Sequence, residues 1–459
     1  MSVDRTTRVW RVGLLLLLGL AEVVAAQEET PENPLVNGRA PLAEPGLAFN
    51  AGVLYSDNVR RTPDEQMGGG VGTVGTTVNL VRTGTRLNYD LVGNLQWAHY
   101  FDNAYPHKLL GFFDGNALFG IVPHYFEWVA QESINQLTAD PFAAPTPQDT
   151  STASYFTTGP RGYVRFGMTT LILSGEYGNT RTSSASAAPG VGNVALDSNR
   201  YTGTATLRRA LSSVNFVSLT GSLERVRFNN ASETDYDRSQ GYLSYDATSA
   251  RTHVSMSAGY VHLHALANEI NQQANRAPGG PTARFDARRQ ISSTSSIVVW
   301  ASQEVADALD LSRTDIRTSV DGPTTVRIAR STPVRDRALS VGWYYKRGRN
   351  ELLADARWTE EHSDADTQFN RTVETGGLKY QRRLWPVLNL RLHGTYDHER
   401  YDVAGVVTRE IDWGAALTYK PRPAYAVAFR YDHYNRSSSV LSARFKETRI
   451  GVTFIYHVP

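Results

Sequence analysis

The chain has 459 residues, of which 41% are hydrophobic and 20% charged. It is therefore too apolar for a disordered chain and long enough for one large domain or several small ones. Lys plus Arg (47) nearly balance Asp plus Glu (45), which argues against a nucleic-acid partner. Cysteine is absent, so disulfide frameworks, thiolate nucleophiles, Cys-ligated metals and a lipidated N-terminal cysteine are excluded.

Residues 1–26 have the pattern of a secretory signal. Three arginines precede an uncharged apolar run, and small residues at 24–26 offer a cleavage site. The apolar run is about half the roughly 20 residues that a spanning helix needs, which favours export over a retained anchor. Residues 27–45 carry four prolines among acidic residues and are expected to form a periplasmic tether or a partial plug.

From residue 46 to the end, the sequence alternates at period two. The mean hydropathy of −0.36 is that of a soluble protein. A transmembrane β-barrel escapes such averages because lipid-facing apolar residues alternate with lumen-facing polar ones. The clearest apolar faces are Leu87, Tyr89, Leu91, Leu95 and Trp97; Leu388, Leu390, Leu392 and Tyr396; Ile411, Trp413, Ala415, Leu417 and Tyr419; and Ile450, Val452, Phe454 and Tyr456.

Short and long connections alternate between these segments. Short turns are expected near 83–84, 123, 168–169, 211–213, 250, 291–292, 347–349, 385–386 and 421–423, and longer polar loops include 136–153, 305–333 and 435–441. Bacterial outer-membrane barrels have short periplasmic turns, long extracellular loops and an even strand count. We therefore predict a single all-β, antiparallel, up-and-down barrel over 46–459 with about 20 strands, within a range of 16 to 20. Residues 282–304 can be read as one strand or two.

The longest loop, 305–333, contains the segment Val305 to Leu311, which favours a short helix. Two interpretations are open: the loop folds into the lumen as a constriction, or it remains a cap or surface loop.

The alternation also selects polar residues for the inner face. The expected pore-lining residues are Arg86, Asp90, Glu176, Glu224, Arg391, His393, Asp397, Asp412, Arg430 and Asp432. Their mixed charge predicts a polar, weakly ion-selective interior that also suits neutral or acidic sugars. No catalytic residue, metal site or cofactor is predicted.

Histidines next to aspartates are the most enzyme-like feature. In Asp397-His398 and Asp432-His433 the neighbours point to opposite faces of a strand, so neither pair is a base and its orienting acid. His262 and His264 share one strand face, but two imidazoles without a third ligand are a weak metal signal.

The C-terminus resembles an outer-membrane assembly signal through Arg449, Gly451, Phe454 and Tyr456, although three more residues follow the last aromatic. The resemblance implies the barrel assembly machinery as a partner, and the barrel itself implies contact with outer-membrane lipid and lipopolysaccharide.

The first barrel segment, with Tyr55-Ser56-Asp57-Asn58-Val59, resembles the opening strand of a family of β-barrel porins. These porins are often encoded in exopolysaccharide and exosortase (PEP-CTERM) gene clusters of Gram-negative bacteria. The resemblance implies a pore linked to polysaccharide export or assembly, with polysaccharide or periplasmic export components as partners, and it supplies no catalytic residues.

The predicted function is thus an outer-membrane pore linked to exopolysaccharide. Three alternatives stay open. An outer-membrane enzyme would need His398, His433 or another rim residue to meet a nucleophile or a second carboxylate across strands. A plugged receptor or structural barrel would fill its lumen with 27–45 or 305–333. A soluble secreted β-protein would lack a continuous apolar band on its outer faces.

Overall fold

The structure is a computed structural model that describes residues 46–183, 196–230, 233, 235–266, 279–318, 326–364 and 366–459. The predicted signal (1–26) and tether (27–45) lie outside the described residues.

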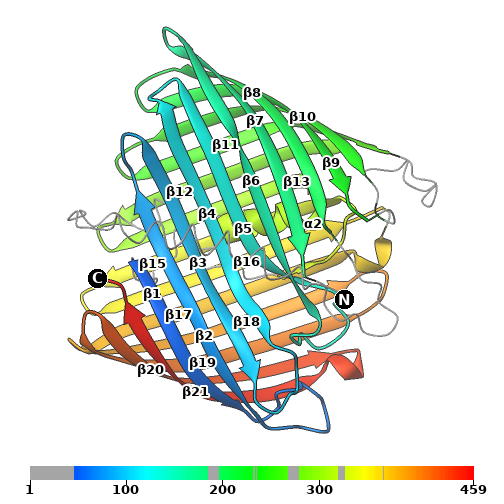
Figure 1. The fold of residues 1–459 in the computed structure, drawn as a ribbon, viewed down its shortest axis with the longest axis vertical. Coiled ribbons are helices and arrows are strands. Elements are labelled where there is room, and N and C mark those ends of the chain that lie inside the picture. The colour runs from blue at the N-terminus through cyan, green and yellow to red at the C-terminus, as the bar shows by residue number, and fades with distance from the viewer. Residues whose placement is uncertain are drawn as a thin grey trace, which may run out of the picture.

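The fold is a closed antiparallel β-barrel (Figure 1). Its wall strands are β1 (Gly46–Ser56), β2 (Gly69–Arg82), β3 (Leu87–Tyr100), β4 (Lys108–Val122), β5 (Phe126–Thr138), β6 (Thr150–Phe166), β7 (Thr169–Thr182), β8 (Ser198–Ala210), β9 (Asn215–Phe228), β10 (Tyr236–Thr248), β11 (Thr252–Ala265), β12 (Gly280–Ser292), β13 (Ser295–Ala306), β15 (Val334–Arg347), β16 (Asn350–His362), β17 (Arg371–Trp385), β18 (Leu388–Tyr401), β19 (Val407–Arg422), β20 (Tyr425–Ser438) and β21 (Phe445–His457). Each strand pairs with the next, and β1 pairs with β21 to close the ring. The predicted 20-strand barrel is confirmed.

The remaining elements lie in the connections. The loop between β13 and β15 holds α2 (Ala308–Thr318) and the two-residue β14 (Arg327–Ile328). Two 3-10 helices, η1 (Thr367–Phe369) and η2 (Leu441–Ala443), lie in later loops. No helix among the described residues is long and apolar enough to cross a membrane.

The period-two alternation sorts side chains between the two faces of the wall. Outward side chains such as Leu223 and Phe429 are 68% and 54% exposed. Inward neighbours such as Ser222 and Thr220 are buried. An apolar outer wall around a polar interior is the arrangement that a bilayer requires, because a closed barrel leaves no strand edge unpaired in lipid.

The two ends of the barrel differ in their connections. One end carries only short turns, such as Gly348 at φ 60°, and we call it the short-turn mouth. The other end carries the longer loops and is the long-loop mouth. In an outer-membrane barrel these are the periplasmic and extracellular sides, respectively.

Sequence reasoning located the turns better than the loop boundaries. Residues 282–304 form two strands, β12 and β13, with the turn at 293–294. The predicted loop 136–153 was too long, since β5 continues to Thr138 and β6 begins at Thr150. The predicted loop 435–441 was placed too early, since β20 continues to Ser438. Near the long-loop mouth both strand faces meet polar surroundings, so the alternation fades before the hydrogen-bonded ladder ends.

Candidate functional site at the long-loop mouth

The described parts of the loop 307–333, residues 307–318 and 326–333, fold into the lumen, so the constriction is the interpretation that the structure supports. Asp307 begins α2 as its N-cap: its Oδ1 accepts hydrogen bonds from the backbone N–H groups of Leu309 and Asp310, both at 3.0 Å. Leu309 and Leu311 are 3% and 2% exposed. In Figure 1, α2 lies within the outline of the barrel, and its contacts are with β4, β5 and β13.

The start of the loop is held by a first ion-pair cluster, which we call the β8–β10 clamp. Arg200 of β8 pairs with Asp307 in a short contact and approaches Asp310 at 3.4 Å. Arg238 of β10 lies 3.0 Å from Asp310, and the Tyr236 hydroxyl donates to Asp307 at 2.7 Å. Arg200 has no exposed surface. The clamp thus joins the start of the loop to one side of the barrel wall.

The far end of the loop is held by a second cluster, the β15–β17 clamp. Asp315 of α2 receives two hydrogen bonds from Arg327 of β14, at 2.6 and 3.0 Å, and a short one from Arg357 of β16. Glu361 of β16 accepts from Arg327 and from Arg371 of β17, both at 2.8 Å. Asp336 and Arg330 complete this buried cluster. The loop therefore spans the lumen between two separate parts of the wall.

Two carboxylates of the loop, Asp310 and Asp315, are held in their charged form. Burial of Asp315 acts to raise its pKa, but the positive charges of Arg327 and Arg357 outweigh it and hold the pKa below its usual range. The same balance at Asp310, with Arg200 and Arg238 as the main cations, also lowers its pKa. Both clamps are consequently networks of charged groups at neutral pH.

A second loop, 139–149, crosses the same mouth. Its Phe142 ring meets Tyr401, at the end of β18, edge to face with 4.9 Å between centroids, and stacks on Phe369 at 6.0 Å. Its Pro145 carbonyl accepts a hydrogen bond from Arg61, which pairs with Glu447 of β21 at 2.8 Å. Burial raises the pKa of Asp149 in this loop to about 7. Two loops thus narrow the long-loop mouth.

Several of the predicted pore-lining residues meet on the inner faces of β18–β20. His393 Nε2 lies 3.5 Å from Asp412 Oδ1 and 3.4 Å from Asp432 Oδ1. Arg430 Nε lies 2.6 Å from the other oxygen of Asp432. Asp397 lies on the same strand face as His393. The cluster offers fixed charges of both signs to a solute in the lumen.

The other predicted residues are dispersed. Glu224 lies beside the β8–β10 clamp, 3.4 Å from Arg238, and Glu176 lies 3.8 Å from Arg161. Arg391 donates to Gln381 at 3.1 Å. Asp90 lies on the inward face of β3, and Arg86 lies in the turn before β3.

The two histidines that follow aspartates in the sequence, His398 and His433, both point outward. His398 Nδ1 lies 3.4 Å from Glu374 Oε2, and His433 Nδ1 lies 3.2 Å from Thr448 Oγ1. In the part of the chain that the structure describes, the polar partner of each of these two histidines is a single side chain, which does not make up a set of base, orienting acid and nucleophile. His262 and His264 share the outer face of β11, and among the described residues no group of three or more His, Cys, Asp or Glu side chains is arranged so that it could hold a metal ion.

The residues of the predicted assembly signal lie in β21. Phe454, 47% exposed, faces outward together with Tyr456. Arg449 and Gly451 alternate with them on the inward face, where Arg449 pairs with Glu447 at 2.7 Å.

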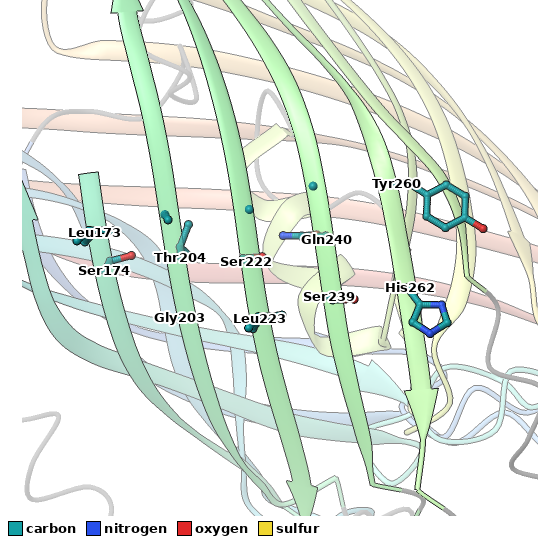
Figure 2. A pocket seen from close by; sticks show the side chains of 13 residues that line it. Leu173, Ser174, Gly203, Thr204, Ser222, Leu223, Ser239, Gln240, Tyr260 and His262 are labelled. Atoms are coloured by element: carbon teal, nitrogen blue, oxygen red, sulfur yellow. The ribbon is translucent and has the colours of Figure 1, made fainter. Parts of the chain in front are cut away.

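The outer wall is hollowed over β7–β11 (Figure 2). Gly203, Gly221 and Gly241 lie in this hollow between Leu173 and Tyr260. A Cβ added at Gly203 or Gly221 would have no atom within 4 Å. The hollow faces the bilayer side of the barrel and is separate from the mouth.

Sequence reasoning missed most of the two clamps. The cap Asp307 lay within the segment expected to be helical, but Arg200, Asp315, Arg327, Arg357 and Arg371 were not singled out. The available signal was the concentration of charged residues on inward positions near the ends of long loops. That signal does not reveal which charges pair, because pairing depends on the path of the loop.

A closed barrel of this size, apolar outside and polar inside, defines a class: the chain is a bacterial outer-membrane β-barrel protein. Comparison with protein-family models and with curated proteins gives no match.

Solved structures with similar barrels include Pseudomonas aeruginosa OccK2 (OpdF) in complex with glucuronate, at 9% identity and a TM-score of 0.37, covering 90% of this chain and 98% of that one. A BenF-like porin from Pseudomonas fluorescens has 9% identity, a TM-score of 0.36 and the same coverages. The FrpB iron transporter from Neisseria meningitidis has 9% identity and a TM-score of 0.44, covering 90% and 83%. At these values the likeness concerns barrel architecture and assigns no solute.

Proposed function

We propose that the protein is an outer-membrane channel for polar solutes, narrowed at its long-loop mouth by the loop 307–333. The observation that carries this proposal is the clamped loop inside a 20-strand barrel. Barrels of 16–18 strands leave an aqueous channel, so wall side chains alone do not fill a ring of this size. A dedicated internal loop is what turns such a ring into a selective passage.

The lumen surfaces support a polar cargo. The inner faces of β8 and β9 carry small hydroxyl side chains, such as Thr206 and Thr220, whose hydroxyls lie 3.0 Å apart. The inner faces of β18–β20 carry the cluster of His393, Asp412, Arg430 and Asp432. Hydroxyls and mixed charges bind sugars and other hydrated solutes through hydrogen bonds. The proposal includes an exopolysaccharide cargo, which rests on the resemblance of the first strand.

The test is single-channel conductance of the refolded protein in a planar bilayer, compared with a variant in which residues 308–332 are replaced by a short Gly-Ser linker. The expected result is a small, stable conductance for the full chain and a larger one for the variant. Neutral and acidic oligosaccharides should block the current. If the loop-replaced variant inserts as a folded barrel and passes no current, the proposal that the protein is a channel is refuted.

The second candidate is a plugged receptor or structural barrel. It is favoured by the second loop, because Phe142 and Arg61 tie loop 139–149 across the same mouth. Under this alternative, the full chain inserts without conducting and only the loop-replaced variant conducts.

A further inference from the structure

The barrel wall is interrupted between β4 and β5 at the long-loop mouth. The two strands pair from Val122–Phe126 up to Phe113–Ile134, and their pairing ends there. Above that point β4 continues to pair with β3 as far as Lys108, and β5 continues to pair with β6 as far as Thr138. The facing edges of 108–112 and 135–138 are therefore separated although both segments remain strands.

Gly111 explains where the strands part. It has φ 109°, a backbone conformation that residues with a side chain rarely adopt. A Cβ at this position would lie 1.9 Å from the carbonyl oxygen of Asn94 on β3. The backbone of β4 thus turns away from β5 at a residue whose conformation is easily changed.

The vacated edge of β5 is taken by the loop in the lumen. β14 pairs in parallel with the end of β5, Arg327 with Leu137 and Ile328 with Thr138. The Ala329 N–H donates to the Thr138 carbonyl at 2.8 Å. Since β6 occupies one edge of β5, β14 occupies the edge that β4 uses lower in the wall. The inward face of β5 also binds α2, through Asn135 and the Ser312 carbonyl at 3.3 Å.

Among the residues that the structure describes, the corresponding edge of β4 is covered by side chains and not by a strand. Gln136 Nε2 reaches the Leu109 and Gly111 carbonyls, both at 3.4 Å, and Thr152 Oγ1 reaches the Leu109 carbonyl at 3.3 Å. The Lys108 ammonium donates to the Pro147 and Thr150 carbonyls. These side-chain contacts stand in place of the backbone hydrogen bonds that β4 and β5 would form if their register continued beyond Phe113–Ile134.

We propose that β14 and the long-loop end of β4 are alternative partners for one edge of β5. When loop 307–333 leaves the lumen, the edge of β5 loses β14, and its backbone N–H and C=O groups are left without a strand partner. Extending the register from Phe113–Ile134 places Gly111 opposite Gln136 and Leu109 opposite Thr138. Zippering of β4 onto β5 then restores a continuous wall, so opening of the mouth and closure of the wall are one transition.

This inference rests on the proposed function only where it links the exchange of strands to opening of a channel. The exchange itself can be tested without conductance, because disulfide cross-linking reports strand pairing directly. The chain contains no cysteine, so engineered pairs form the only disulfides. The pair Ile328→Cys/Thr138→Cys reports β14 on β5, and the pair Leu109→Cys/Thr138→Cys reports β4 on β5. Both pairs use position 138, and β14 and β4 cannot both pair with β5 at that position. A matched control is Ala117→Cys/Ala130→Cys, which joins directly paired residues of the same two strands.

In the full-length barrel, the first pair and the control are expected to cross-link on mild oxidation, while the second pair does not. Replacing residues 308–332 by a linker removes β14, and the second pair is then expected to cross-link as readily as the control. Gel mobility of the folded barrel measures both. The proposal is overturned if the second pair cross-links equally with the loop docked, or if it stays reduced in the loop-replaced variant while the control forms.

Conductance separates this result from the proposed function. Oxidised Ile328→Cys/Thr138→Cys is expected to lose open events that reductant restores. If no variant conducts while the cross-links follow the expected pattern, the channel fails and the exchange of partners stands. If oxidation leaves the open events unchanged, withdrawal of β14 is not the opening step, and the coupling is refuted.

Discussion

Asp315→Asn tests whether charge pairing holds the loop in the lumen. Asp315 is fully buried and receives hydrogen bonds from both Arg327 and Arg357. The asparagine keeps the shape of the side chain but leaves two buried guanidinium groups without this negative partner. Removing one member of a buried ion pair costs about 3–5 kcal/mol. The cost arises only in the docked state, because withdrawal of the loop returns both arginines to water.

At the lower end, a loss of about 3 kcal/mol raises the ratio of withdrawn to docked loop about 150-fold. Limited trypsin digestion measures this ratio, since cleavage tracks the open population when opening is fast relative to cutting. The loop offers Arg313, Arg327 and Arg330 as cleavage sites. Cleavage there should accelerate by the same factor in the variant.

The matched control is Asp237→Asn, which removes a carboxylate from a partly exposed pair with Arg225 and Arg227 on the outer wall. Exposed pairs contribute about 0–1 kcal/mol, so cleavage of the loop should hardly change. An acceleration below about fivefold for Asp315→Asn, equivalent to about 1 kcal/mol, would refute the view that this clamp holds the loop.

Three further predictions, tested with four variants, concern the same mouth and lumen. Asp149 has a pKa raised by burial to about 7, so its contribution to the stability of loop 139–149 is complete below about pH 4 and is lost as pH rises to about 7; protease protection of this loop should therefore fall between about pH 4 and 7 and level off above, and Asp149→Asn should abolish that fall. Asp307→Ala removes the N-cap of α2 and a partner of Arg200; the cap alone should cost about 1 kcal/mol, visible as faster trypsin cleavage of loop 307–333. In a KCl gradient, Asp412→Asn should shift the reversal potential toward anion preference and Arg430→Gln toward cation preference, and shifts of the same sign would show that these charges do not face the ion path.

The barrel could be predicted from sequence because its signal is local and repeated. Alternation such as Leu388, Leu390 and Leu392 against polar neighbours is imposed strand by strand by lipid on one side and water on the other. Turn positions followed from the same pattern, as at Gly348. The predicted helix was right in kind but was placed three residues too early, because Val305 and Ala306 complete β13 before Asp307 caps α2, which begins at Ala308.

The clamps could not be predicted for a physical reason. Arg357 and Glu361 lie on the inward face of β16, where any wet barrel carries polar residues, and only the path of the loop converts them into buried partners. Arg200 shows the same limit: its position on β8 predicts a hydrated lumen side chain, yet it is fully buried against Asp307. Long-range pairing of charges leaves no periodic trace in the sequence.

The chemistry of the clamps gives a reason for holding the loop by ion pairs between side chains and not by a large apolar core. Buried ion pairs add little net stability compared with apolar packing of the same volume, but they strongly penalise a wrong partner. The groups of the two clamps regain full hydration when the loop withdraws, whereas an apolar contact surface would be left exposed to water. Small apolar contacts, such as Leu309 with Leu137 and Ala153, then set the position of the loop, while the charges keep its release reversible. A mouth built in this way opens at the expense of a few apolar contacts and not of a large hydrophobic surface, which suits a passage for hydrated solutes.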